Sequence, residues 1–211
     1  MLKPKLQHNA NLSLVFDFGG VVFDWDPYYL YRSFFENDRR AVELFLEEIK
    51  LKEWNFALDE GAPFSETVER IASQNPQYGD LIRAFDDRWI ETMGGVIQPT
   101  IDLLAELHEN GIPLFALSNW SAETFPRIRH QYDFLDWFDQ IVLSGEEKIC
   151  KPNPRIFQRF LERTGNRASN SLFIDDSPVN IQAASRLGFD TVLFESAEQL
   201  KEEIIKRGLL N

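Results

Sequence analysis

The sequence has few of the residues from which disulfides and histidine metal sites are built. Cys150 is the only cysteine among 211 residues, so no internal disulfide forms and a reducing compartment fits best. The three histidines, His8, His108 and His130, are scattered along the chain. These two features exclude a disulfide framework and a histidine-rich metal cluster.

Positive charge is also scarce. Lysine and arginine together number 22 against 34 aspartates and glutamates, which gives a formal net charge of −12. A negative excess of this size repels the phosphates of nucleic acids and the surfaces of anionic membranes. We therefore expect no nucleic-acid partner and no membrane partner, and any phosphate group must be held by a local site.

Long hydrophobic runs are absent as well. The longest early apolar run, from Leu12 to Phe23, is interrupted by Asp17 and is shorter than the ~20 residues of a membrane-spanning helix. No secretory signal is evident, so the sequence predicts a cytoplasmic protein. The 44% of hydrophobic residues suffices for a buried core, and 211 residues suit one full domain with a smaller appendage.

Five short apolar segments predict strands. They are residues 13–16, 113–117, 140–143, 171–174 and 191–194, and none of them alternates polar with apolar residues. Short apolar runs without alternation are typical of strands that are buried on both faces of a parallel sheet.

Helices with recognisable ends separate these strands. One begins at Pro99 and ends before Gly111, while Ser196 and Gln199 predict a capping box for the last helix. Two more helices are expected: Asn153-Pro154 caps one that ends at Gly165, and Ser177-Pro178 caps another that ends at Gly188. This alternation predicts an α/β fold with a Rossmann-like, doubly wound parallel sheet as its core.

Residues 27–95 interrupt the alternation. They contain no convincing strand, and their apolar residues recur at helical spacing: Phe34, Phe35, Val42, Phe45, Leu46, Ile49 and Trp54. We interpret 27–95 as an inserted α-helical cap domain and 12–26 with 96–211 as the core domain. Residues 1–11 are polar and aperiodic, which predicts a loose N-terminal tail.

Polar residues follow the predicted strands, where ligands bind in open parallel sheets. They are Asp17, Ser118, Asn119, Lys151, Asp175 and Asp176. One carboxylate can attack phosphorus, and an aspartate pair can hold Mg²⁺, which prefers oxygen ligands. Hydroxyl and backbone N–H groups can hold phosphoryl oxygens while a lysine balances their charge. The set therefore indicates phosphoryl transfer through an aspartyl-phosphate intermediate.

Four motifs in this order resemble those of the haloacid dehalogenase superfamily. They are Asp17-Phe-Gly-Gly-Val-Val22, Leu117-Ser-Asn119, Lys151-Pro152, and Ile174-Asp-Asp-Ser177 with Asn180. The resemblance implies that Asp17 is the nucleophile, that Ser118 and Asn119 bind phosphate, and that Lys151 neutralises charge. It further implies that Asp17, Asp176 and the carbonyl oxygen of Gly19 ligate Mg²⁺, with Asp175 acting mainly through water. In similar enzymes a helical cap lies between the first and second motifs.

The superfamily contains both phosphatases and dehalogenases. The adjacent carboxylates of Asp175 and Asp176 repel each other unless a cation or hydrogen-bond donors compensate them, which favours a metal and therefore phosphate. We expect a magnesium-dependent phosphatase, a monomer or homodimer, that hydrolyses a small-molecule phosphate ester. A sugar phosphate is the first choice by analogy. The alternatives are a metal-independent 2-haloacid dehalogenase and a non-catalytic phosphate-binding protein.

One position departs from the pattern of similar phosphatases, which place a general acid two residues after the nucleophile. Gly19 stands there in this chain. Three explanations are open: Asp24 or Asp26 supplies the proton, the substrate has a good leaving group, or catalysis has been lost. For two tryptophans, Trp54 in the predicted cap and Trp120 directly after Asn119, we favour a place in the hydrophobic core over contact with substrate. For Asn180, a role in orienting the aspartate pair and an ordinary helix surface are equally open.

Overall fold

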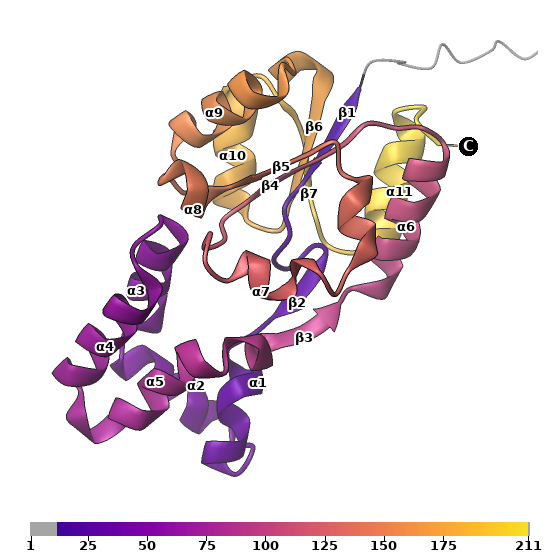
Figure 1. The fold of residues 1–211 in the computed structure, drawn as a ribbon. Helices are drawn as coiled ribbons and strands as arrows, with labels where there is room; N and C mark the ends of the chain where they lie inside the picture. Colours follow the sequence, from indigo (N-terminus) through magenta and orange to yellow (C-terminus); the bar gives the residue numbers. More distant parts are fainter. Residues whose placement is uncertain (1–11, 211) are drawn as a thin grey trace, which may run out of the picture.

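The computed structural model describes residues 12–210, so the predicted tail 1–11 lies outside the described residues. Its centre is a five-stranded sheet in the order β5-β4-β1-β6-β7, with every neighbouring pair parallel. The strands are β1 (Ser13–Phe16), β4 (Leu114–Ser118), β5 (Gln140–Leu143), β6 (Ser171–Asp175) and β7 (Asp190–Leu193). The predicted α/β fold with a parallel sheet is confirmed (Figure 1).

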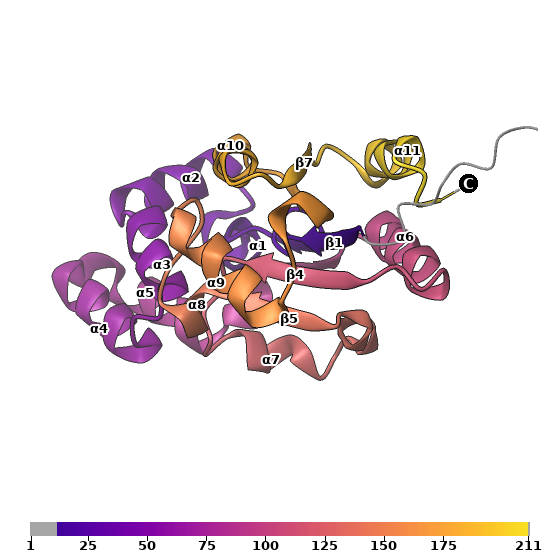
Figure 2. The same ribbon diagram turned by 90° about the horizontal axis from the view of Figure 1, so that it is seen from above.

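Helices cover both faces of this sheet (Figure 2). Leu14 and Phe16 of β1 face a layer that includes α6 (Gln98–Glu109) and α11 (Ala197–Lys206), and Val15 faces α9 (Pro154–Thr164) and α10 (Pro178–Arg186). Because successive side chains of a strand point to opposite faces, both faces of β1 need apolar residues. That requirement explains the unbroken apolar run that ends at Asp17.

The order of the strands determines where the candidate site residues lie. β1 lies between β4 and β6, with Leu14 opposite Leu114 on one side and Leu172 on the other. Since the three strands are parallel and in register, their carboxyl ends meet at one edge of the sheet.

The predicted helix ends agree with the structure in most places. The Asn153 side chain accepts a hydrogen bond from the Arg155 N–H at 3.1 Å, and Gly165 ends α9 with φ +71°. The Ser196 hydroxyl accepts from the Gln199 N–H at 3.2 Å, but the Gln199 side chain accepts from Glu195, so only half of the capping box forms.

The capping role given to Ser177 is wrong. Its side chain makes no capping hydrogen bond with α10; instead its backbone N–H donates to Asp175 Oδ1 at 2.8 Å. A carboxylate at a helix N-terminus is a stronger acceptor than a hydroxyl, and β6 delivers Asp175 to that position.

The remaining elements belong mainly to the segment between the first two motifs. A two-stranded antiparallel ribbon, β2 (Phe23–Trp25) and β3 (Met93–Val96), connects the sheet to α1 (Tyr28–Tyr31), α2 (Arg39–Glu48), α3 (Leu51–Asp59), α4 (Phe64–Gln74) and α5 (Gly79–Asp87). We call the segment from α1 to η3 (Trp89–Thr92) the helical insert; Figure 1 shows it on the side of the sheet where β2 and β3 emerge. The short elements are α7 (Phe125–Arg129), α8 (Ser144–Glu147), η1 (Arg32–Phe35), η2 (Pro76–Tyr78), η4 (Asp133–Trp137) and η5 (Ala168–Asn170).

The insert is helical as predicted, but the ribbon was not foreseen. The sequence of β3 is Met-Gly-Gly-Val, which has neither alternation nor a β-branched run, and none of its residues is fully buried. The domain boundaries of 27 and 95 stay a prediction. Within residues 12–210, no helix has the length and apolar character required to cross a bilayer.

Candidate active site

Asp17, the first residue after β1, lies at the centre of the site. Its Oδ1 accepts hydrogen bonds from the Ser118 hydroxyl and the Phe18 N–H, both at 2.7 Å, and its Oδ2 lies 2.9 Å from Lys151 Nζ. Burial raises the pKa of Asp17 to about 7, the Lys151 ammonium opposes this rise, and the neighbouring Asp175 adds to it. A cation beside Asp17 would favour the carboxylate form that a nucleophile needs.

Lys151 is fully buried and makes three contacts with its ammonium group. Its Nζ lies 2.6 Å from Asp175 Oδ2 and 2.9 Å from Asp17 Oδ2, and it donates to the carbonyl oxygen of Leu117 at 2.9 Å. Burial alone lowers the pKa of Lys151, but the two aspartates outweigh burial and raise it. The side chain is therefore a charged group whose three N–H donors are all engaged.

Asp175 is also fully buried, and both of its oxygens are occupied. Oδ1 accepts from the Ser177 N–H at 2.8 Å, and Oδ2 accepts from Lys151. Asn180 Nδ2 lies 3.0 and 3.1 Å from the two oxygens, and Asn180 is itself buried. Of the two open interpretations of Asn180, the contacts favour the one in which it orients the aspartate pair.

Asp176 is the exposed member of an acidic cluster. One carboxylate oxygen from each of Asp17, Asp175 and Asp176 lies within 4.8 Å of the others. Burial raises the pKa of Asp176, and the Asp175 charge raises it further. The single Lys151 ammonium cannot balance three carboxylates, and an all-oxygen donor set suits Mg²⁺. The residues present thus fit the predicted metal, with Asp176 the carboxylate that has the fewest protein partners among the three.

Gly20 leaves space for Asp176. Its φ is +72°, and a Cβ at this position would lie 2.2 Å from Asp176 Oδ2. We expect Gly20→Ala to displace that carboxylate and to raise by about tenfold the Mg²⁺ concentration that gives half-maximal thermal stabilisation. Gly165→Ala is a matched control, because Gly165 has φ +71° and open space around it. Equal Mg²⁺ dependence in the two variants would contradict this prediction.

The side chain of Asn119 is hydrogen-bonded to the backbone of Lys151. Its Nδ2 donates to the Lys151 carbonyl oxygen at 3.0 Å, and its Oδ1 accepts from the Lys151 N–H at 2.8 Å. The side chain therefore fixes the backbone that carries Lys151. A direct contribution of Asn119 to phosphate binding would have to come from its backbone.

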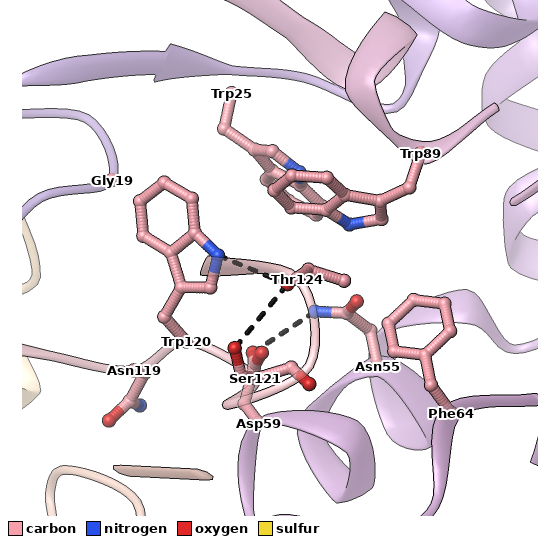
Figure 3. Close-up of a pocket in the computed structure, with 10 residues that line it drawn as sticks. All are labelled: Gly19, Trp25, Asn55, Asp59, Phe64, Trp89, Asn119, Trp120, Ser121 and Thr124. Atoms are coloured by element: carbon pink, nitrogen blue, oxygen red, sulfur yellow. Dashed lines mark hydrogen bonds between the residues drawn. The ribbon is translucent and has the colours of Figure 1, made fainter. Parts of the chain in front are cut away.

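A cavity of about 130 Å³ opens beside these residues, between the sheet and the helical insert. The wall from the core consists of Gly19, Asn119, Trp120, Ser121 and Thr124, and the opposite wall consists of Trp25, Asn55, Asp59, Phe64 and Trp89 (Figure 3). Trp120 is both a core residue and a cavity residue: it is buried and donates from Nε1 to the Thr124 hydroxyl at 3.1 Å, and it also lines the cavity. Trp54 packs inside the insert and donates to the Ile49 carbonyl oxygen, in agreement with the core interpretation.

Neither proposed substitute for the missing acid lines this cavity. Asp24 Oδ2 accepts from the Tyr29 hydroxyl at 2.7 Å, and Asp26 Oδ2 pairs with Arg39 at 3.1 Å. The carboxylate that does line it is Asp59, which the sequence did not single out. Asp59 sits in a charged stretch near the end of a helix, and no local pattern distinguishes it from a solvent-exposed residue.

Comparison with known proteins places these features in a family. The sequence profile of the haloacid dehalogenase-like hydrolases matches residues 13–188. D-ribitol-5-phosphate phosphatase of Bacteroides thetaiotaomicron is 24% identical over 206 residues, covering 91% of this chain and 96% of that protein. Sesquiterpene phosphatase astK of Aspergillus oryzae is 25% identical over 82% of this chain and 85% of its own length. Acyl-CoA dehydrogenase family member 10 of Mus musculus is 34% identical over 106 residues, but the chain spans only 9% of that protein.

Solved structures share the fold. A haloacid dehalogenase family enzyme of Bacteroides thetaiotaomicron, crystallised with magnesium and inorganic phosphate, superimposes with a TM-score of 0.66 at 24% identity, covering 90% of this chain and 98% of that one. L-2-haloacid dehalogenase of Xanthobacter autotrophicus gives 0.61 at 18% identity, covering 94% and 84%. The fold alone is therefore common to a phosphate-binding enzyme and a dehalogenase.

Proposed function

Because this chain belongs to the haloacid dehalogenase-like hydrolase family, we propose that it is a magnesium-dependent phosphatase acting through an aspartyl phosphate on Asp17. The observation that carries the proposal is the cluster of Asp17, Asp175 and Asp176 around one buried Lys151. The three carboxylates carry more negative charge than the Lys151 ammonium can balance, so the cluster can bind a divalent cation. It also places the nucleophilic carboxylate next to that cation.

Each residue has a defined task in this scheme. Asp17 attacks phosphorus, and the alcohol leaves as the bond between phosphorus and the ester oxygen breaks. The Ser118 hydroxyl and backbone N–H groups after β4 hold the phosphoryl oxygens, and Lys151 holds Asp17 and Asp175 in place. Asp17, Asp176 and the Gly19 carbonyl group would hold Mg²⁺, with Asp175 contributing through water. When bound, Mg²⁺ supplies the positive charge that offsets repulsion between the phosphate and Asp17.

The acidic cluster favours this function over dehalogenation. A hydrolytic dehalogenase needs a carboxylate nucleophile but no metal, so it has no use for the exposed carboxylate of Asp176 beside the buried Asp17 and Asp175. Two relatives that match most of the chain are named as phosphatases, one for D-ribitol 5-phosphate and one for a sesquiterpene.

The cavity indicates the size of the substrate. Its volume of about 130 Å³ suits a small leaving group, and its lining combines indole rings with the polar side chains of Asn55 and Ser121. Aromatic faces together with hydrogen-bonding groups suit the alternating C–H and O–H groups of a polyol or sugar. We therefore propose a small phosphorylated metabolite, with sugar phosphates as the first class to test.

A panel of phosphate esters, assayed with Mg²⁺ and with a chelator, tests the proposal. We expect phosphate release from at least one small ester, a fall of at least about 10²-fold with chelator, and recovery when Mg²⁺ is restored. The control is chloride release from a 2-chloroacid under both conditions. Chelator-resistant chloride release without phosphatase activity would establish a dehalogenase, and Mg²⁺-dependent binding of phosphate without turnover would establish a binding protein.

A further inference from the structure

Asp59 is the one ionisable side chain among the ten residues that line the cavity. It is the last residue of α3 and therefore comes from the helical insert, whereas the catalytic residues proposed above come from the core. In Figure 3, its carboxylate lies beside Ser121 of the core and next to Asn55, whose Nδ2 donates to Asp59 Oδ2 at 3.1 Å. The side chain thus bridges the two walls of the cavity.

The backbone of Asp59 is held to the core as well. Its carbonyl oxygen accepts a hydrogen bond from the Ser144 hydroxyl at 2.6 Å, and the same hydroxyl oxygen accepts from the Trp120 N–H at 2.9 Å. Ser144 is fully buried. This chain of contacts ties the end of α3 to the loop after β4 and to the first residue of α8, so hydrogen bonds fix the position of Asp59 relative to the proposed nucleophile.

The surroundings of Asp59 favour its protonated form. Burial raises the pKa of Asp59 to about 7, the Asp17 charge adds to this rise, and the backbone of Ser121 opposes it. Its place at the carboxyl end of α3 disfavours the anion further. Glu60, the next residue, is exposed, and Lys148 Nζ donates to the Gly61 carbonyl oxygen at 3.1 Å. The Cys150 thiol also lies within reach of the Asp59 charge, which helps burial to raise the pKa of Cys150. Near neutral pH, Asp59 can therefore both give and take a proton.

Gly19 lies on the same cavity and leaves room for a proton donor. A Cβ at Gly19 would meet no atom within 4 Å, so the space where similar phosphatases carry their acid is open. The reaction still requires a proton for any leaving group that is a poor anion, since an alkoxide is too basic to depart unassisted. Asp59 is the lining residue that can supply it.

We propose that Asp59 is the general acid and base of this enzyme and that it acts from the insert in place of the acid missing at Gly19. This inference rests on the proposed phosphatase function. As Asp17 bonds to phosphorus and the ester bond breaks, the Asp59 carboxyl group protonates the departing oxygen. The Asp59 carboxylate then takes a proton from the water that attacks the aspartyl phosphate. Inorganic phosphate leaves, and Asp17 and Asp59 return to their starting forms.

A pair of substrates with different leaving groups tests this role. We expect Asp59→Asn to lower kcat for a simple alkyl phosphate by about 10²–10⁴-fold and to change kcat for p-nitrophenyl phosphate by less than about tenfold. Nitrophenolate leaves without a proton, so it does not need the acid. Glu60→Gln is the matched control, because it removes the adjacent exposed carboxylate, and it should leave both rates unchanged.

Two further measurements separate an acid from a structural residue. In wild type, kcat/KM for the alkyl phosphate should fall as pH rises through about 7, because the neutral acid is lost, and Asp59→Asn should abolish this decline. The double variant Gly19→Asp/Asp59→Asn should hydrolyse the alkyl phosphate at least about tenfold faster than Asp59→Asn alone, since Gly19 has space for a side chain.

Several outcomes would overturn the assignment. Alkyl phosphatase activity within about threefold of wild type in Asp59→Asn would do so, as would an equal loss on both substrates, which would indicate a positioning role. If Asp59→Asn does not fold, the wild-type enzyme provides the test. A kcat for p-nitrophenyl phosphate more than about 10³-fold above that for the alkyl phosphate would show that no general acid operates. Failure of the proposed function is recognised separately, by the Asp17 variant described below.

Discussion

Replacing Asp17 with asparagine should reduce phosphate-ester hydrolysis by at least about 10³-fold, on substrates with good and poor leaving groups alike. Asparagine has nearly the same shape, and its amide oxygen can still accept from Ser118 and the Phe18 N–H. What the variant loses is a nucleophile able to bond to phosphorus. The uniform loss distinguishes this residue from Asp59, whose loss should be selective for poor leaving groups.

The measurement is kcat for p-nitrophenyl phosphate at saturating Mg²⁺, together with mass spectrometry of the rapidly quenched enzyme. We expect a phosphoryl group on the peptide that contains Asp17 in wild type and none in the variant. Asp80→Asn is a suitable control, because that carboxylate is fully exposed on α5. Phosphatase activity that survives in Asp17→Asn would refute both the nucleophile and the mechanism.

Lys151→Met should lower the free energy of unfolding by about 3–5 kcal/mol and abolish activity. The methionine fills a similar volume, but Asp17 and Asp175 then lie in the protein without the ammonium that contacts them at 2.9 and 2.6 Å. An unpaired buried carboxylate costs several kcal/mol, whereas the loss of an exposed charge costs little.

Urea denaturation in the absence of divalent cations measures this effect. Lys148→Met is the matched control: its ammonium is exposed and donates to the Gly61 carbonyl oxygen, so a change below about 1 kcal/mol is expected. Adding Asp175→Asn to Lys151→Met should recover part of the stability by removing one of the uncompensated charges. A Lys151→Met protein as stable as wild type would show that the buried triad contributes nothing to folding.

Local sequence patterns predicted the core well. β1 and β5 have the predicted bounds, and the other three strands of the main sheet differ from prediction by a single residue at one or both ends. Strands buried on both faces need continuous apolar runs, which are visible in the sequence. Glycine marks helix ends because it adopts the left-handed backbone conformation found there. The polar residues at the strand ends were predicted to share one edge, because parallel strands in adjacent positions bring their carboxyl ends together.

The ribbon that connects the core to the insert was not predictable in the same way. β3 includes two adjacent glycines, and it is a strand only because its backbone pairs with β2, about seventy residues earlier in the chain. Pairing between distant segments carries no local signature in a strand such as β3, none of whose residues is buried.

The sequence by itself determined the identity and order of the groups that can perform the chemistry: Asp17, Ser118, Lys151 and the pair Asp175 and Asp176 each follow a strand whose apolar pattern is read locally. Only the tertiary structure decided that Asn119 holds the Lys151 backbone and that Asp59 reaches the cavity from the insert. The physical reason is that a side chain's role depends on its partners. Partners of strand-end residues follow from sheet geometry, whereas those of Asp59 follow from how a separate group of helices packs against the core.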